Sequence, residues 1–136
     1  MSYRRVSLVL LASARAELDR WTGSAAVAQR HSFLPPLQKR LAASRETVAA
    51  WIASEPRMEW VRPEGGCVSF PRIKPSVKID IDRFYRELDE SAVAVGPGHW
   101  FEQDRRFMRI GYGWPTAEEL KAGLAAISKA LEVATS

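Results

Sequence analysis

Arg109 is the residue whose type and setting point most directly to chemistry. It lies in a short strand-like run between Met108 and Ile110. Successive side chains of a strand point to opposite faces, so Met108 and Ile110 would face one way and Arg109 the other. A guanidinium on a strand presents a planar fork of donors that matches a carboxylate, and such a charge-assisted pair contributes about 1.5–3 kcal/mol. From spacing alone, a carboxylate site and a solvated edge-strand arginine both remain open.

Two loops rich in glycine lie beside strand-like segments. Gly65 and Gly66 precede a strand predicted over 67–70, and a glycine pair favours positive φ or close backbone approach. A hairpin turn without a ligand explains this pattern equally well. The second loop is Gly-Pro-Gly at 96–98, after a strand predicted over 92–95.

The sequence gives little support to metal or thiol chemistry. The two histidines, His31 and His99, have no acidic companions at ligand spacing, so we predict no metal site. Cys67 is the single cysteine, which excludes an intramolecular disulfide.

The elements that must position Arg109 can be predicted from periodicity and caps. We predict a helix over 6–21 that ends at Gly23, and a second helix that starts at Pro35-Pro36 and ends near Pro56. Asp80 can cap a third helix, and Thr116 forms a capping box with Glu119 at the start of a fourth. Strands are predicted over 58–61, 67–70, 92–95 and 107–111.

This order predicts an α+β fold (an α/β two-layer arrangement). It would have a small mixed or antiparallel sheet of three to four strands, helices packed mainly on one face, and an N-terminal helix. We divide the chain into an N-terminal helical segment, 1–31, and a main domain, 32–136.

Composition narrows the classes of function. The 136 residues are 46% hydrophobic and 26% charged, as in globular proteins, with a net charge of +4. The basic residues are scattered, so we predict no nucleic-acid partner. No segment approaches the roughly 20 apolar residues of a membrane span, and we predict no membrane association and a cytoplasmic protein. Arg4 and Arg5 before an apolar run faintly resemble a secretory signal, which is the alternative.

Taken together, the motifs resemble the C-terminal small domain of fold type I pyridoxal-phosphate-dependent aminotransferases (class I/II). The resemblance rests on three segments in order, covering roughly 37–131. These are Arg-Pro-Glu-Gly-Gly-Cys-Val-Ser-Phe-Pro-Arg, then Val-Gly-Pro-Gly-His-Trp-Phe, then Phe-Met-Arg-Ile-Gly-Tyr-Gly before the capped helix. The N-terminal segment would correspond to the tail of a large domain.

The resemblance implies roles for three residues. Arg109 would bind the α-carboxylate of the substrate, while Val68 and Gly66 would contribute to the wall of the pocket. It also implies pyridoxal phosphate in the complete enzyme, with an amino acid and a 2-oxo acid as substrates.

The family's catalytic lysine normally lies in the large domain, and no lysine here has its sequence context. We therefore predict no catalytic residue, no cofactor-binding residue and no covalently bound cofactor in this chain, which would be inactive alone. Its partner would be a second copy or a chain that supplies the large domain. The alternative is a non-enzymatic module that binds a small carboxylate or docks onto a partner.

Overall fold

A computed structural model describes residues 23–136, with side chains from residue 28 onward, so the helix predicted over 6–21 lies outside the described residues. Contacts divide the chain into one unit, Met1–Gln38, and a second, Lys39–Ser136. The second unit contains the strands and most of the described helices. The domain boundary between 31 and 32 stays a prediction.

Helix α2 (Gly23–Ser54) corrects two predictions, because it includes Gly23 and continues through Pro35 and Pro36. A proline within a helix leaves the carbonyl four residues earlier without its usual donor. Here those carbonyls belong to His31 and Ser32, which are exposed and can bond water instead. The double proline therefore lies inside the helix rather than at its start.

All the described strands are short and pair antiparallel. Strand β1 (Met58–Glu59) pairs with β3 (Arg72–Ile73). Strand β5 (Met108–Gly111) lies at the centre of a second sheet, between β2 (Val68–Ser69) and β4 (Gly96–Pro97). The predicted α+β class with a small antiparallel sheet is confirmed.

Two strand predictions differ from the structure. The strand expected over 92–95 is displaced to β4, because Gly96 is the residue that pairs with Arg109. Val93 and Val95 instead pack against the core without ladder bonds of their own. Strand β3 was not predicted, because Pro71 before it and the linker after it mask its short apolar signal.

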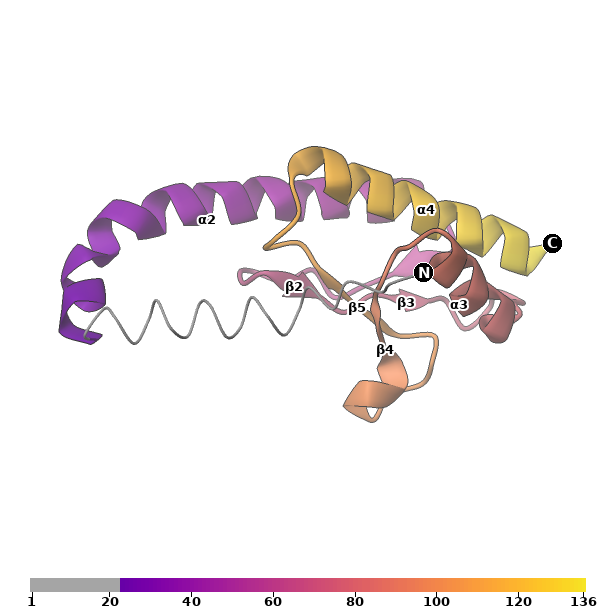
Figure 1. The fold of residues 1–136 in the computed structure, drawn as a ribbon. Helices are drawn as coiled ribbons and strands as arrows, with labels where there is room; N and C mark the ends of the chain where they lie inside the picture. The colour runs from indigo at the N-terminus through magenta and orange to yellow at the C-terminus, as the bar shows by residue number, and fades with distance from the viewer. Residues whose placement is uncertain (1–22) are drawn as a thin grey trace. The chain divides into compact units, whose positions relative to one another are not determined.

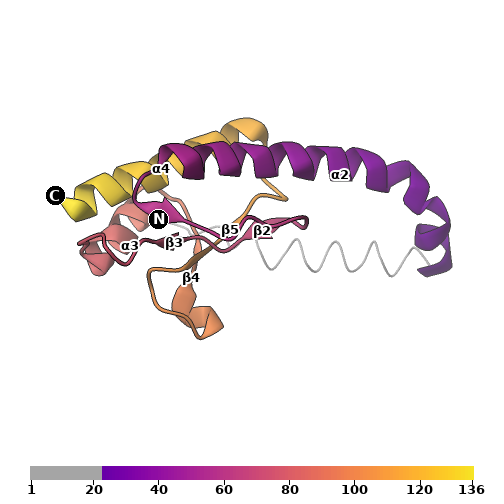
Figure 2. The ribbon, with the colours of Figure 1, turned by 180° about the vertical axis from the view of Figure 1, so that it is seen from behind.

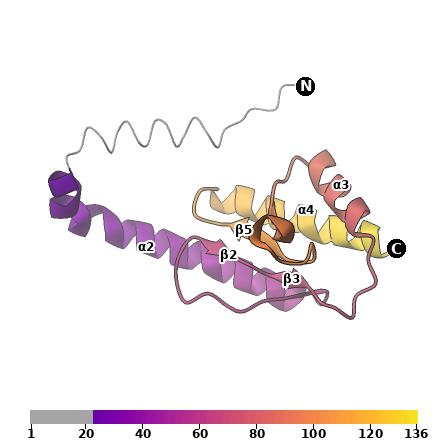
Figure 3. The same cartoon turned by 90° about the horizontal axis from the view of Figure 1, so that it is seen from below.

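The helices cover one side of the strands. The second half of α2 and helix α4 (Ala117–Thr135) lie on this side, as Figures 1 and 2 show, and helix α3 (Ile81–Glu90) packs beside α4 (Figure 3). Both predicted caps are present: Asp80 accepts from the Arg83 amide, and Thr116 forms its capping box. The core lies between helices and strands and includes Val48, Met58, Ile73, Phe84, Leu88, Met108, Ile110, Tyr112, Leu124 and Leu131.

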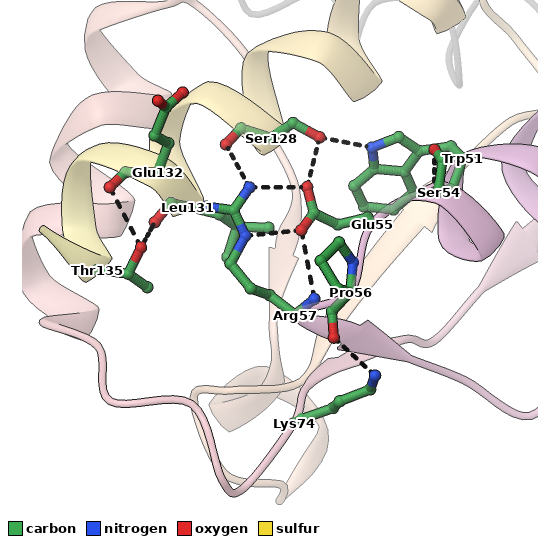
Figure 4. A network of polar contacts seen from close by, with 10 residues as sticks. All are labelled: Trp51, Ser54, Glu55, Pro56, Arg57, Lys74, Ser128, Leu131, Glu132 and Thr135. Atoms are coloured by element: carbon green, nitrogen blue, oxygen red, sulfur yellow. Dashed lines mark hydrogen bonds and ion pairs between the residues drawn. The ribbon is translucent and has the colours of Figure 1, made fainter.

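A buried polar network ties the end of α2 to α4 (Figure 4). The carboxylate of Glu55 accepts from Arg57 at 2.6 and 3.0 Å and from the Ser128 hydroxyl at 2.9 Å. The indole of Trp51 in turn donates to Ser128 at 2.8 Å. Burial acts to raise the pKa of the Glu55 carboxyl, but the hydrogen bonds from Arg57 and Ser128 outweigh it and hold the pKa below its ordinary value. The network thus links two helices through one ionised carboxylate.

Replacing Glu55 with glutamine should lower the free energy of unfolding by about 1–3 kcal/mol at neutral pH, because its hydrogen bonds lose their charge. A lowered pKa gives a stabilisation that is present above the ordinary pKa of 4.5 and is lost as pH falls through the lowered value. The difference between wild type and variant, measured by urea denaturation, should therefore shrink in acid.

Glu46 provides the matched control, since it pairs with Arg62 on the surface. Glu46→Gln should cost less than about 1 kcal/mol. Equal losses for Glu55→Gln and Glu46→Gln at neutral pH would contradict the proposed importance of the buried network.

Candidate functional site

The alternation of β5 separates a buried face from an exposed one. Met108 and Ile110 are buried, whereas Arg109 between them is exposed, as the sequence predicted. Strand β2 alternates in the same way, with Ser69 buried and Val68 exposed by 42%. We call the uncovered side the open face; its members on β2, β5 and the adjoining residues are Val68, Phe70, Arg72, Phe107, Arg109 and Gly111.

The strand register places specific neighbours on each side of Arg109. Gly96 of β4 is its partner on one side. On the other, Ser69 pairs with Ile110 and Arg72 bridges to Phe107, so the same register sets Phe70 opposite Arg109. Val68 pairs with Gly111 and lies diagonally from Arg109 on the open face. The structure thus places two of the three predicted site residues, Arg109 and Val68, on the open face.

Gly66, the third predicted residue, lies in the turn that leads into β2. It has φ of 81°, a left-handed conformation that favours glycine, and nothing would meet a Cβ there. The requirement for glycine at this position is therefore conformational rather than steric. The turn sets the position from which Val68 enters the open face.

An aromatic ring supports the Arg109 side chain. The guanidinium lies over the ring of Phe101 at 5.1 Å from its centroid, within the range of a cation–π interaction. Phe101 comes from the short 3-10 helix η1 (Gly98–Phe101), which Figure 1 shows on the side of the strands away from α2 and α4. Within the described residues, Arg109 has no hydrogen bond or ion pair, so its donors are available to a ligand.

A hollow of about 430 Å³ lies at the edge of the open face, next to Phe70. Its basic residue, Arg72, is already paired with Glu59 at 2.5 Å and lies over the ring of Phe107. This arginine is therefore neutralised, in contrast to Arg109. The other lining residues are Trp60 and Val61.

Several polar groups lie outside the open face. His99 is exposed and its ring contacts Trp100, as expected of a surface histidine. Burial raises the pKa of Tyr85 to about 12, and its hydroxyl donates to the carbonyl of Arg105. This tyrosine is thus neutral at physiological pH and holds the loop before β5. No cluster of potential metal ligands occurs among the described residues, and no helix among them is long and apolar enough to cross a bilayer.

Sequence reasoning missed the roles of Phe70 and Phe101. Phe70 follows Val68 by two residues, so the period of a strand could have placed both on one face. Phe101 was part of a motif, but its contact with Arg109 depends on how the loop folds back. No local pattern specifies that contact.

Comparison with known proteins gives structural relatives only. No family model matches the sequence, and no curated protein does. The fold is similar to that of a PLP-dependent aminotransferase from Streptococcus suis, with 27% identity, a TM-score of 0.71, and coverage of 82% of this chain and 29% of that one. It is also similar to α-aminoadipate aminotransferase from Thermus thermophilus, with 17% identity, a TM-score of 0.65, and coverage of 81% and 28%.

A third relative is the PLP-dependent cyclase OrfR, with 22% identity, a TM-score of 0.67, and coverage of 80% and 30%. The chain therefore has the fold of one part of the pyridoxal-phosphate-dependent aminotransferases, and the resemblance predicted from the sequence is confirmed. It spans less than a third of the length of these relatives.

Gly98 should be essential for the loop that carries Phe101. A Cβ at this position would lie 2.1 Å from the backbone carbonyl oxygen of Asp104 and 2.9 Å from that of Phe107. Gly98→Ala should therefore lower the free energy of unfolding by about 1–3 kcal/mol or more, measured by urea denaturation.

Gly123 is the matched control, because it lies within α4 and nothing would meet its Cβ. Gly123→Ala should stabilise the protein by about 0.5–1 kcal/mol. If both substitutions had the same effect, the close packing at Gly98 would not be a constraint.

Proposed function

We propose that this chain is the small domain of a pyridoxal-phosphate-dependent aminotransferase, in which Arg109 binds the α-carboxylate of the substrate. The observation that carries the proposal is the state of Arg109. It is exposed on a strand, lies opposite aromatic and glycine neighbours, and has no counter-ion among the described residues. A strand-borne guanidinium without a partner is suited to a carboxylate ligand.

The chain does not fit the cofactor by itself. Its five lysines, all among the described residues, do not lie on the open face. Lys74 donates to the carbonyl of Pro56, Lys121 and Lys129 are exposed on α4, and Lys39 and Lys78 are exposed elsewhere. Pyridoxal phosphate would thus be held by a large domain on another part of the protein or on a partner.

Within such an enzyme, this chain would orient the substrate rather than transfer protons. Arg109 would fix the carboxylate with two parallel hydrogen bonds, and Val68 and Gly66 would border the substrate. Holding a reactant in the productive orientation removes part of the entropic barrier. A cytoplasmic location and an assembly with a second copy or a large-domain chain belong to the same proposal.

A specific observation favours a second candidate, a partner-docking module without enzymatic activity. Three large apolar side chains are strongly exposed in the second unit: Val61, Trp100 and Trp114. Tryptophan is enriched at protein–protein interfaces, so the two exposed tryptophans favour contact with a partner. In this alternative, Arg109 would pair with a carboxylate side chain of the partner instead of a substrate.

Substitution of Arg109 in the complete enzyme tests its proposed role as the carboxylate ligand. Arg109→Lys should mainly raise KM, because lysine keeps the charge but loses the paired donors. Arg109→Ala should lower kcat/KM about a hundredfold or more for amino acids. Steady-state kinetics with amino acids and with amines that lack a carboxylate measure both effects.

Arg83→Ala, on the exposed surface of α3, is the control and should leave both classes of substrate unaffected. Amines without a carboxylate should also be little affected by the changes at Arg109. Equal losses for both classes would show that Arg109 has a structural role.

The isolated chain should form no stable lysine adduct with pyridoxal phosphate. Borohydride reduction followed by peptide mass spectrometry should find at most scattered, substoichiometric labelling, since no lysine is placed to hold the cofactor. Stoichiometric labelling of a single lysine would contradict the proposal that the cofactor is held elsewhere.

A further inference from the structure

We propose that Phe101 is the positioning residue that fixes the guanidinium of Arg109 on the open face, an inference that rests on the proposed function of Arg109 as the carboxylate ligand. The ring lies 5.1 Å from the guanidinium carbon. A flexible arginine on an exposed strand has many rotamers, and no hydrogen bond or ion pair among the described residues restricts this one. The ring is therefore the contact that selects its orientation.

The loop between β4 and β5 brings the ring to this place. Pro97 precedes η1, and Glu102, with φ of 58°, ends it in a left-handed conformation. The amide of Gln103 then donates to the carbonyl of Gly98 at 3.0 Å. Gly98 must lack a side chain because the backbone of Asp104 and Phe107 closes over it. These constraints turn the chain back on itself, so that the ring of Phe101 contacts the guanidinium of Arg109 on β5.

Gly96 leaves the space that the ring occupies. A Cβ on this residue would lie 3.2 Å from Cβ of Arg109 and 3.2 Å from the Phe101 ring. Both contacts are tighter than ordinary van der Waals separation, so any side chain here would press the ring away from the arginine. The strand partner of Arg109 is thus shaped to admit the ring.

A second layer of rings supports Phe101 from the opposite strand. Phe70 meets Phe101 edge to face, with centroids 5.5 Å apart and planes at 81°. Phe70 is itself stacked on Phe107 at 5.4 Å. Edge-to-face and offset-stacked rings are the favoured arrangements of aromatic pairs. Phe101 is therefore held between the strand beneath it and the ring beside it, although it is 37% exposed.

This arrangement leaves the binding edge of Arg109 free. A cation–π contact is an electrostatic attraction between the cation and the ring and needs no oxygen acceptor, whereas a carboxylate accepts hydrogen bonds from the N–H donors. Both interactions can therefore form at once. Phe101 orients the fork without competing for the hydrogen bonds that a carboxylate needs.

The test uses NMR of the arginine Nε–Hε groups in the full chain, titrated with acetate as the carboxylate probe. In the wild type, the ring current of Phe101 should displace the Arg109 signal from the positions of the exposed arginines. Phe101→Leu should remove this displacement and weaken acetate binding about two- to fivefold, because leucine keeps apolar bulk but has no π face. Phe101→Tyr, which retains the ring, should preserve both properties.

Two further variants complete the design. The methyl group that Gly96→Ala adds on β4 should press the Phe101 ring away from Arg109. This variant should therefore reduce the displacement of the Arg109 signal even if Phe101→Leu proves unstable. Phe33→Leu, on the exposed surface of α2, is the matched control and should change neither readout.

The outcomes separate this inference from the proposed function. If the Arg109 signal stays unchanged in both Phe101→Leu and Gly96→Ala, the positioning role is overturned. If the signal shifts as expected but the wild type does not bind acetate through Arg109, the positioning of the guanidinium is supported and its proposed function as the carboxylate ligand is overturned.

Discussion

The fold depends on β5, a strand of four residues whose side chains point alternately into the core and to the open face. Met108 and Ile110 enter a core built with α4, whereas Arg109 must remain outside it, because an unpaired guanidinium cannot be buried without a large desolvation cost. A slip of one residue in register would exchange these positions. The pairing of β5 with β2 and β4 is therefore what fixes Arg109 on the open face.

Two devices keep the central strand in place. On the helical side, the Glu55–Arg57–Ser128 network joins α2 to α4 and so holds the layer that covers the strands. On the open side, the ring of Phe101 contacts the guanidinium of Arg109, and Phe70 packs against Phe101. We expect the buried network to contribute to stability and the two rings to set the orientation of Arg109. Together they leave the open face with one cation, Arg109, that has no counter-ion among the described residues, and this supports the proposed binding of a carboxylate.

Local signals in the sequence predicted what depends on neighbours in the chain. The capping box at Thr116, the cap at Asp80 and the outward position of Arg109 all follow from spacings of two to four residues. The continuation of α2 through Pro35 and Pro36 was not predictable, because it depends on solvent access to the carbonyls before them. The position of β4 and the contact of Phe101 with Arg109 depend on pairing and loop return, which join residues distant in sequence.

We propose that Arg109 on the open face receives the carboxylate of an amino acid substrate. The most direct measurement is a crystal structure of the complete protein, with whatever chain or domain supplies the lysine, bound to an unreactive amino acid analogue. We expect the carboxylate of the analogue to accept two hydrogen bonds from Arg109 at about 2.7–2.9 Å. Finding Arg109 paired with a carboxylate side chain of the adjoining protein, and the analogue bound elsewhere, would contradict it.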